Sequence, residues 1–233
     1  MNASQFNISL KDAISFIQEI GLFKSVGVKT VGQYSEEIKK ISKTKNHREI
    51  YECAIKNLDY EILLTDDSIF QFSYNAGELR YAFIQNPAKF VSKEDYLTYI
   101  LTPDEINEIE SVDDLLELVN ENEYEQFLNE QELNSTSNIL RYDASSLGYK
   151  PLIHPFSHIH IGLNSDFRIP VSILLTPLTF AKFCIKNTYY EIWKNAFTII
   201  EDFPNRILQS KNLCNLLDNK QWSEIEKAEL YLK

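Results

Sequence analysis

The sequence has few cysteines and no long apolar run. Its three cysteines are scattered, odd in number and placed within apolar helical patterns, at Cys53, Cys184 and Cys214. This usage is typical of reduced thiols in a cytosol and argues against a disulfide framework. No apolar stretch approaches the ~18 residues that a membrane-spanning helix needs, and the amino terminus shows no basic leader. We therefore expect a cytoplasmic protein without a membrane segment.

Several widespread sequence motifs are also absent. The chain has no glycine-rich phosphate loop, no nucleophile elbow and no Cys-x-x-Cys pair, and it has no internal repeat or low-complexity tract. These absences exclude several large enzyme classes. Any chemistry must therefore come from a different arrangement of side chains.

Basic residues are missing from one section of the chain. Residues 94–140 contain fourteen acidic side chains and no Lys or Arg, whereas the net charge of the whole chain is −11. The other residues therefore carry a net charge of +3. A solvated helical face explains such a run, and a docking surface for a basic partner protein encoded nearby is the alternative. The overall acidity argues against a protein that coats DNA.

Hydrophobic periodicity predicts helices in the first and last parts of the chain. A helix with Ser9 as its cap begins at Leu10, and another runs from Ser35 to about Asn57 with a break around Asn46. Thr176-Pro177 is a strong start for a long helix, and a last helix is expected from Ser223 to Leu232. Helices are also expected in the acidic section, at residues 92–101, from 102, and at 111–133.

The middle of the chain has strand character. Residues 61–64, 68–74 and 78–85 predict a three-stranded antiparallel meander, and further strands are expected at 138–143, 156–162 and 167–171. We therefore predict an α+β fold with an antiparallel sheet of five to six strands flanked by helices. It forms one domain, 1–233, with a helical part at 1–58, the sheet and acidic helices at 59–171, and C-terminal helices at 176–232.

Three of the four histidines fall within seven residues, at His154, His158 and His160. On a strand, the alternation of side chains places His158 and His160 on one face and the isoleucines between and after them on the other. Histidine exchanges protons near neutral pH, so the pair suits a base and an acid, or two ligands of a metal. His154 precedes a proline and is held less precisely.

Arg141 and Asp143 alternate in the same way on the preceding strand. If the polar faces of the two strands match, both converge with His158 and His160, and Arg168 supplies a second cation. A carboxylate orients an imidazole, and a guanidinium holds a phosphate. We therefore take His158, His160, Arg141 and Asp143 as candidate catalytic residues, and Arg168, His154 and Tyr142 as candidate substrate contacts.

Structural roles are the alternative for each of these residues. The histidines can be hydrogen-bonded core residues, Arg141 and Asp143 can simply pair with each other, and Tyr142 can belong to the core. A zinc or other divalent metal site would use His154, His158 and His160, although no cofactor is required. The spacing lacks the later ligands of the His-x-His-x-Asp-His signature, and Asn164 and Ser165 stand where a cupin has glutamate.

These residues also carry a resemblance to a known family. Arg141-Tyr142-Asp143, His154-Pro155, residues 157–162 and Arg168-Ile169-Pro170, followed by Thr176-Pro177 and Phe180, resemble an uncharacterised bacterial family, domain of unknown function 2290. This resemblance implies a prokaryotic cytoplasmic protein and no known activity. The order RYD, HP and HxH is similar, more faintly, to small bacterial toxins of toxin–antitoxin pairs.

Two functions follow as hypotheses. The first is a phosphodiesterase or nuclease-like enzyme that acts on RNA or a nucleotide, such as an RNase-type toxin or antiphage defence effector, with His158 and His160 as the acid–base pair. The second is a non-enzymatic subunit of a bacterial defence or toxin–antitoxin complex that docks through the acidic helical surface.

Overall fold

The chain divides into two compact units. The computed structural model describes residues 1–27, 34–42, 44–88, 91–107, 109, 111–130, 137–163 and 166–232. Unit 1 comprises Met1–Gln85 and Asn138–Lys233, and unit 2 comprises Asn86–Ser137. Unit 1 therefore contains the predicted sheet and the residues of the candidate site, and unit 2 contains most of the acidic section.

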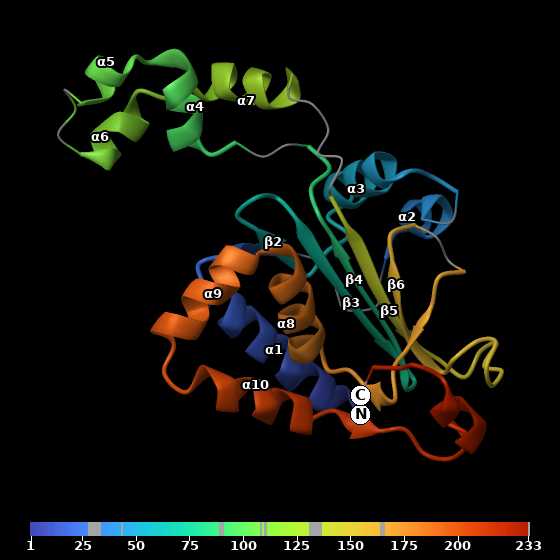
Figure 1. Ribbon diagram of the computed structural model, residues 1–233. Coiled ribbons are helices and arrows are strands. Elements are labelled where there is room, and N and C mark those ends of the chain that lie inside the picture. The colour runs from blue at the N-terminus through green and yellow to red at the C-terminus, as the bar shows by residue number, and fades with distance from the viewer. Residues whose placement is uncertain are drawn as a thin grey trace. The chain divides into compact units, whose positions relative to one another are not determined.

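Unit 1 is built around a seven-stranded antiparallel sheet in which every strand pairs with the next strand along the chain (Figure 1). The strands are β1 (Phe23–Val26), β2 (Ile62–Leu64), β3 (Ile69–Asn75), β4 (Glu78–Ile84), β5 (Ile139–Ala144), β6 (Ser157–Ile161) and β7 (Ile169–Pro170). The predicted α+β class and antiparallel meander are confirmed. The additional strand is β1, which lies outside the predicted strands and pairs with β2.

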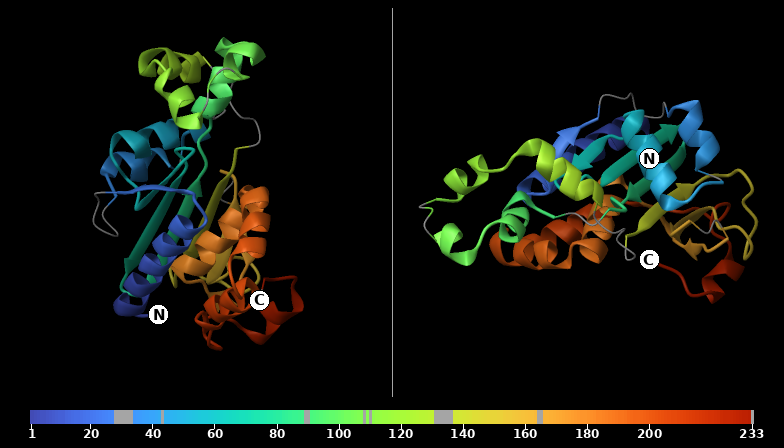
Figure 2. Two further views of the ribbon diagram at one scale, coloured as in Figure 1. Left: turned by 90° about the vertical axis from the view of Figure 1, so that its left-hand side faces the viewer. Right: turned by 90° about the horizontal axis from the view of Figure 1, so that it is seen from above.

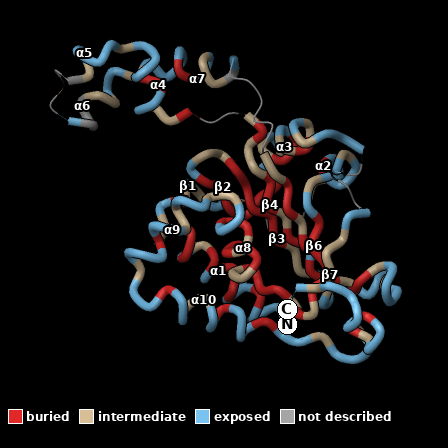
Figure 3. Tube along the Cα trace, viewed as in Figure 1, coloured by how far each residue is buried: buried red, intermediate tan, exposed pale blue. Residues whose placement is uncertain are grey.

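One face of the sheet carries the main hydrophobic core. Helices α1 (Ala3–Glu19) and α8 (Pro177–Thr188) pack on it, as Figures 1 and 2 show from different sides. Alternate residues of the strands point into this layer, where aromatic rings dominate. The largest fully buried side chains there include Phe6, Phe70, Phe72, Phe83, Tyr142 and Phe180, and Figure 3 shows the buried residues gathered between the sheet and these helices.

The opposite face is only partly covered. Helices α2 (Glu36–Ile41) and α3 (His47–Lys56) pack on it through a second apolar cluster that includes Ile69, Ile84 and Ile139. These three residues form one row across β3, β4 and β5. Farther along the strands the same face carries polar side chains, and the candidate site lies there.

Helix boundaries follow local capping more closely than the predicted periodicity. Helix α1 begins at Ala3 because Asn2 accepts a hydrogen bond from the Gln5 amide. The predicted cap Ser9 is wrong: it lies inside α1 and accepts a hydrogen bond from the Leu178 amide. The predicted break around Asn46 is confirmed, since Asn46 caps α3.

The C-terminal helices are shorter than predicted. The long helix from Thr176 ends at Thr188 and is followed by α9 (Tyr190–Ile199) and α10 (Phe203–Asn212). A small two-stranded sheet pairs β8 (Ile173–Leu174) with β9 (Asn215–Leu216). The predicted last helix is only a 3-10 turn, η1 (Glu224–Ala228), because the chain then extends and the Leu232 amide donates to the Pro170 carbonyl.

Unit 2 is helical and has a small core. Its helices are α4 (Lys93–Ile100), α5 (Pro103–Asn107), α6 (Val112–Glu117) and α7 (Glu121–Glu130). The predicted helix at 111–133 is therefore two helices as far as residue 130, and residues 131–133 lie outside the described residues. Val91, Tyr96 and Tyr124 form the buried centre of this unit. In the described part of the chain, no helix combines the length and apolar character needed to cross a bilayer.

Candidate functional site

Pairing of β5 with β6 brings the predicted residues together. Arg141 lies opposite His160, and Asp143 lies opposite His158. Cross-strand partners share a face of the sheet, so all four side chains project from the face opposite the aromatic core. We call the following residues the polar cluster: Arg141, Asp143, His154, His158, His160 and Arg168.

Asp143 contacts His160 at the centre of the polar cluster. Asp143 Oδ2 lies 3.4 Å from Nε2 of His160, whose side chain is only 5% exposed. Burial acts to raise the pKa of Asp143, but the hydrogen bond from His160 and nearby positive charge outweigh it and lower that pKa. Asp143 is therefore an ionised carboxylate in contact with Nε2 of His160.

His158 is buried and held by the main chain. Its Nδ1 lies 2.8 Å from the carbonyl oxygen of Pro155, so this nitrogen donates and Nε2 is left to act as an acceptor. Burial, with the neighbouring His160, lowers the pKa of His158 to about 4. The ring is therefore neutral near pH 7. The rings of His158 and His160 lie close together, with centroids 4.7 Å apart.

The two arginines of the polar cluster have nitrogens that are removed from water and lack partners. Among the residues that the structure describes, Arg141 Nε and Nη2 and Arg168 Nε have no hydrogen-bond acceptor. Burial lowers the pKa of Arg141, and the positive charge of Arg168 lowers it further. Each unpaired buried donor costs roughly 1–3 kcal/mol, and more when it is charged. Two guanidinium groups in this state favour the binding of an anion.

His154 lies at the edge of the polar cluster. Its ring centroid is 5.1 Å from that of His158, and burial followed by the charge of Arg168 lowers its pKa. Its Nδ1 is buried and has no partner among the described residues, as is also true of His160 Nδ1. A two-way main-chain pairing with Lys150 holds this residue in place, so His154 is more ordered than its position before proline suggested.

Tyr142 does not join the polar cluster, and we remove it from the candidate substrate contacts. It points into the aromatic core, where it is fully buried. Its hydroxyl exchanges a hydrogen bond with Ser157 at 2.9 Å and accepts one from the Leu175 amide at 3.0 Å. Strand alternation predicts this outcome, because Tyr142 lies between two residues of the opposite face.

Three residues of the polar cluster have the composition of a metal site. Asp143, His158 and His160 each offer one ligand atom, and these atoms all lie within 4.8 Å of one another. His158 also has a contact that metal-binding histidines commonly make, since its other ring nitrogen, Nδ1, donates to the carbonyl oxygen of Pro155. The carboxylate replaces His154 in the predicted three-histidine set. The same three side chains therefore suit either proton transfer or a divalent cation.

Arg80 is a residue of this surface that the sequence analysis missed. It lies on β4 opposite Asp143, and its Nε is 3.9 Å from Asp143 Oδ1. Its side chain is 61% exposed. Alternation along the meander places Arg80 and Ala82 on one face, but only the register between β4 and β5 shows that this face is the one with the histidines.

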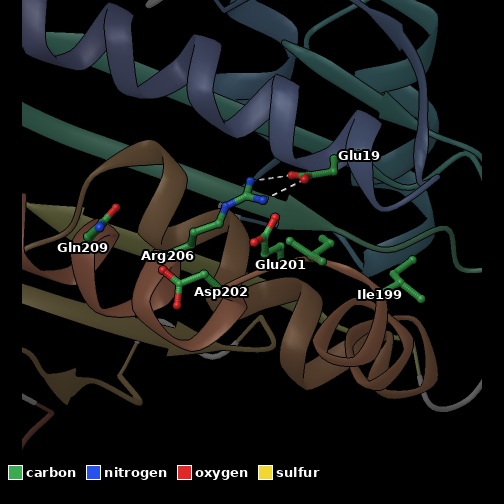
Figure 4. A pocket seen from close by; sticks show the side chains of 7 residues that line it. Glu19, Ile199, Glu201, Asp202, Arg206 and Gln209 are labelled. Atoms are coloured by element: carbon green, nitrogen blue, oxygen red, sulfur yellow. Dashed lines mark hydrogen bonds and ion pairs between the residues drawn. The ribbon is translucent and has the colours of Figure 1, made fainter.

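A separate pocket of about 630 Å³ lies away from the polar cluster, between the end of α1 and the α9–α10 region (Figure 4). Arg206 donates to both carboxylate oxygens of Glu19 across it, at 2.7 and 2.5 Å. Glu201 and Asp202 also line it. None of the predicted site residues does, so the pocket and the polar cluster are different places on unit 1.

Comparison with known proteins bears on the family of the chain. No curated protein and no solved structure matches it. The similarity to toxins therefore has no counterpart in these comparisons and is not carried further. One family model matches residues 4–230, which is nearly the whole chain and more than the C-terminal third on which the resemblance was closest. The chain belongs to this family, described as an uncharacterised conserved protein, DUF2290.

Proposed function

We propose that the polar cluster is the centre of a phosphodiester-cleaving enzyme. The observation that carries this proposal is the pair of partly buried guanidinium groups, Arg141 and Arg168, whose buried nitrogens lack acceptors among the described residues. The two guanidinium groups and the ionised carboxylate of Asp143 together carry a net charge of +1. A phosphodiester carries one negative charge, which balances the net positive charge. Its several oxygens accept hydrogen bonds from the guanidinium nitrogens that lack acceptors.

The two histidines have different environments, which suits opposite roles in proton transfer. His158 is neutral and its Nδ1–H is held by Pro155, so its Nε2 accepts the proton of the attacking hydroxyl group. His160 acts in its protonated, imidazolium form, in which Nε2–H is held by Asp143 and Nδ1–H gives its proton to the leaving oxygen. The bond from phosphorus to the attacking oxygen forms while the bond to the leaving oxygen breaks, and each histidine changes its proton count by one.

A divalent metal at Asp143, His158 and His160 is the competing arrangement. When bound, such an ion would activate water and neutralise charge on the phosphate. It would also add two positive charges to a cluster that already contains two guanidinium groups, and like charges in a partly buried site repel one another. The nearby guanidiniums therefore favour an anion over a cation, which supports acid–base catalysis.

The proposal is tested with histidine variants. We expect His158→Ala and His160→Ala each to lower phosphodiester cleavage at least 100-fold, since general acid–base groups contribute about 10²–10⁴-fold. His47→Ala is the matched control, because His47 lies on α3 and contacts the Gln85 carbonyl. Circular dichroism checks that each variant folds. Full activity in both site variants would remove the histidines from the mechanism, and stoichiometric metal in the active protein would replace acid–base catalysis by the metal arrangement.

A second candidate function concerns unit 2. We propose that, in addition or instead, unit 2 binds a basic partner protein, because its sequence has fourteen acidic residues and only two lysines. Such a surface steers association electrostatically. Its affinity for a copurifying basic protein should fall steeply between 50 and 300 mM salt, as measured by titration at about 25 °C. A salt-independent affinity would contradict this function.

A further inference from the structure

We propose that the substrate of the polar cluster is single-stranded RNA, and that Arg80 and Phe167 bind the nucleotide next to the scissile phosphate. This inference rests on the proposed function. It uses two exposed side chains to which no role has so far been given, Arg80 opposite Asp143 and Phe167 next to Arg168 in the chain, and it names the class of substrate.

Arg80 is placed to contact a second phosphate. It is opposite Asp143, and its neighbour Ala82 is opposite Arg141, so Arg80 and Arg141 are diagonal neighbours on one face of the sheet. Diagonal neighbours lie roughly 7–8 Å apart, comparable to the separation of successive phosphates in a polynucleotide. Among the described residues, the one ionic contact of Arg80 is the 3.9 Å approach to Asp143, which His160 already engages. Its exposed guanidinium is therefore available to an anion outside the polar cluster.

Phe167 supplies an exposed apolar surface next to Arg168 in the chain. It directly precedes Arg168 and is 49% exposed. Exposed aromatic rings near cationic side chains stack on nucleobases in proteins that bind single strands. A guanidinium for the neighbouring phosphate and an aromatic ring for a base together fit a flexible single strand. A mononucleotide would leave Arg80 without a ligand, and a rigid duplex cannot bring one phosphate down to half-buried arginines.

The nucleophile points to RNA rather than DNA. The polar cluster consists of Arg, Asp and His and has no hydroxyl or thiol of its own, while the hydroxyls of Tyr142 and Ser157 are engaged in the core. The 2′-hydroxyl of RNA is already positioned beside its phosphate. Its oxygen forms the new bond to phosphorus, its proton goes to His158, the bond from phosphorus to O5′ breaks, and O5′ receives a proton from His160. The products are a 2′,3′-cyclic phosphate and a 5′-hydroxyl end.

The test compares substrates with many phosphates and with one. A fluorescein-labelled ten-nucleotide RNA, its DNA and 2′-O-methyl counterparts, and the 3′-(4-nitrophenyl) phosphates of uridine and adenosine are incubated with wild type and variants. Of the three ten-nucleotide strands, we expect only the RNA to be cleaved. We expect Arg80→Gln and Phe167→Ala to lower kcat/KM for the ten-nucleotide RNA at least fivefold more than for the one-phosphate substrates. Binding of the uncleavable 2′-O-methyl strand, followed by anisotropy, should weaken by a similar factor.

Two controls separate the possible failures. Lys194→Gln removes an exposed cation on α9 that pairs with Glu191, and it should leave both substrate classes unaffected. Arg80→Lys should restore part of the preference for the longer strand. Cleavage of DNA and RNA alike, or equal losses on both substrate classes in the Arg80 and Phe167 variants, overturns this inference. If the inference fails in this way but Arg141→Gln still loses activity, the proposed phosphodiester-cleaving function is retained. If the wild type cleaves no phosphodiester at all, both the proposed function and this inference are wrong.

Discussion

At the scale of single residues, the distinctive feature of the polar cluster is a set of buried nitrogens that lack hydrogen-bond partners among the described residues. Arg141, Arg168 and His160 each have a buried nitrogen without a partner among the described residues. Protein interiors rarely leave polar atoms in this state, because the desolvation is not repaid. The carboxylate of Asp143 is engaged by His160 and does not satisfy the arginines. A bound anion accepts hydrogen bonds from both guanidinium groups, and from Nδ1 of His160 in the protonated form of that ring.

This deficit predicts a stabilising effect of inorganic phosphate. A ligand that contributes ~1 kcal/mol should raise the Tm of a protein of this size by about 2–4 °C. We expect this shift in differential scanning fluorimetry with phosphate but not with chloride at the same ionic strength. Arg141→Gln and Arg168→Gln should abolish the shift, whereas Lys194→Gln should keep it. An equal shift in all variants would mean that phosphate acts elsewhere.

Lys182 predicts a pH dependence of stability. It is buried, donates to the Arg206 carbonyl and to Ser210, and has its pKa lowered to about 8 by burial and then by Arg206. The unfolded chain keeps this proton to a higher pH, so the folded state is penalised below about pH 8. The penalty is relieved as the pH rises from about 8 towards the ordinary lysine pKa of ~10.4.

The measurement is the free energy of unfolding in urea from pH 7 to 10.5. Relative to Lys182→Met, which has no proton to lose, the wild type should gain on the order of 3 kcal/mol over this range. Buried tyrosines destabilise both proteins at the upper end, and their effect cancels in the difference. Parallel curves for the two proteins would show that Lys182 keeps its ordinary pKa.

At the scale of elements, strand alternation separates structure from chemistry on β5. Tyr142 points into the core and joins β5 to β6 and to the residues before α8, through Ser157 and Leu175. Arg141 and Asp143 point the other way. One strand therefore contributes to both faces of the sheet, and a change on one face need not disturb the other.

Tyr142→Phe should accordingly destabilise the fold without altering the polar cluster. The Leu175 amide would lose its acceptor in a buried place, which costs about 1–3 kcal/mol. We expect this loss in chemical denaturation, with catalytic constants of the folded fraction within twofold of wild type. Tyr190→Phe is the control, since Tyr190 is 63% exposed. A large loss of activity in folded Tyr142→Phe would return this residue to the substrate contacts.

At the scale of the whole molecule, unit 2 interrupts a hairpin of unit 1. β4 and β5 pair directly, and beyond them the amides of Gln85 and Asn138 each donate to the other residue at 3.0 Å. The chain thus leaves and re-enters the sheet at one point. The charge is also distributed unevenly between the units. Unit 2 carries −12 and unit 1 carries +1, which sum to the net charge of −11.

Replacing residues 86–137 by an Asn-Gly turn should therefore leave unit 1 folded, because such a turn suits a two-residue hairpin. We expect cooperative unfolding, a sheet signal in circular dichroism and retained phosphodiester cleavage. Binding of a basic partner should be lost. A shortened chain that is soluble but has no cooperative transition would show that unit 2 stabilises the sheet.

Much of this architecture follows from local signals. The pattern at 61–85 predicted the meander. The alternation on β5 and β6 predicted that His158 and His160 share one face of the sheet, because side chains of a strand alternate regardless of its surroundings. Capping residues such as Thr176 and Asn46 also act locally. β1 was missed because a four-residue edge strand contains too little periodic pattern. The last helix was predicted too long because the Leu232 amide bonds to the Pro170 carbonyl, a residue far away in the chain.

The sequence by itself determined which residue types are available and which side of each strand they occupy. Only the tertiary structure decided that Arg80 faces Asp143, that the Pro155 carbonyl holds His158, and that buried nitrogens of Arg141 and Arg168 have no acceptor among the described residues. These facts depend on strand register and burial, which arise from contacts between residues far apart in the chain. A one-residue shift between β4 and β5 would turn Arg80 into the core.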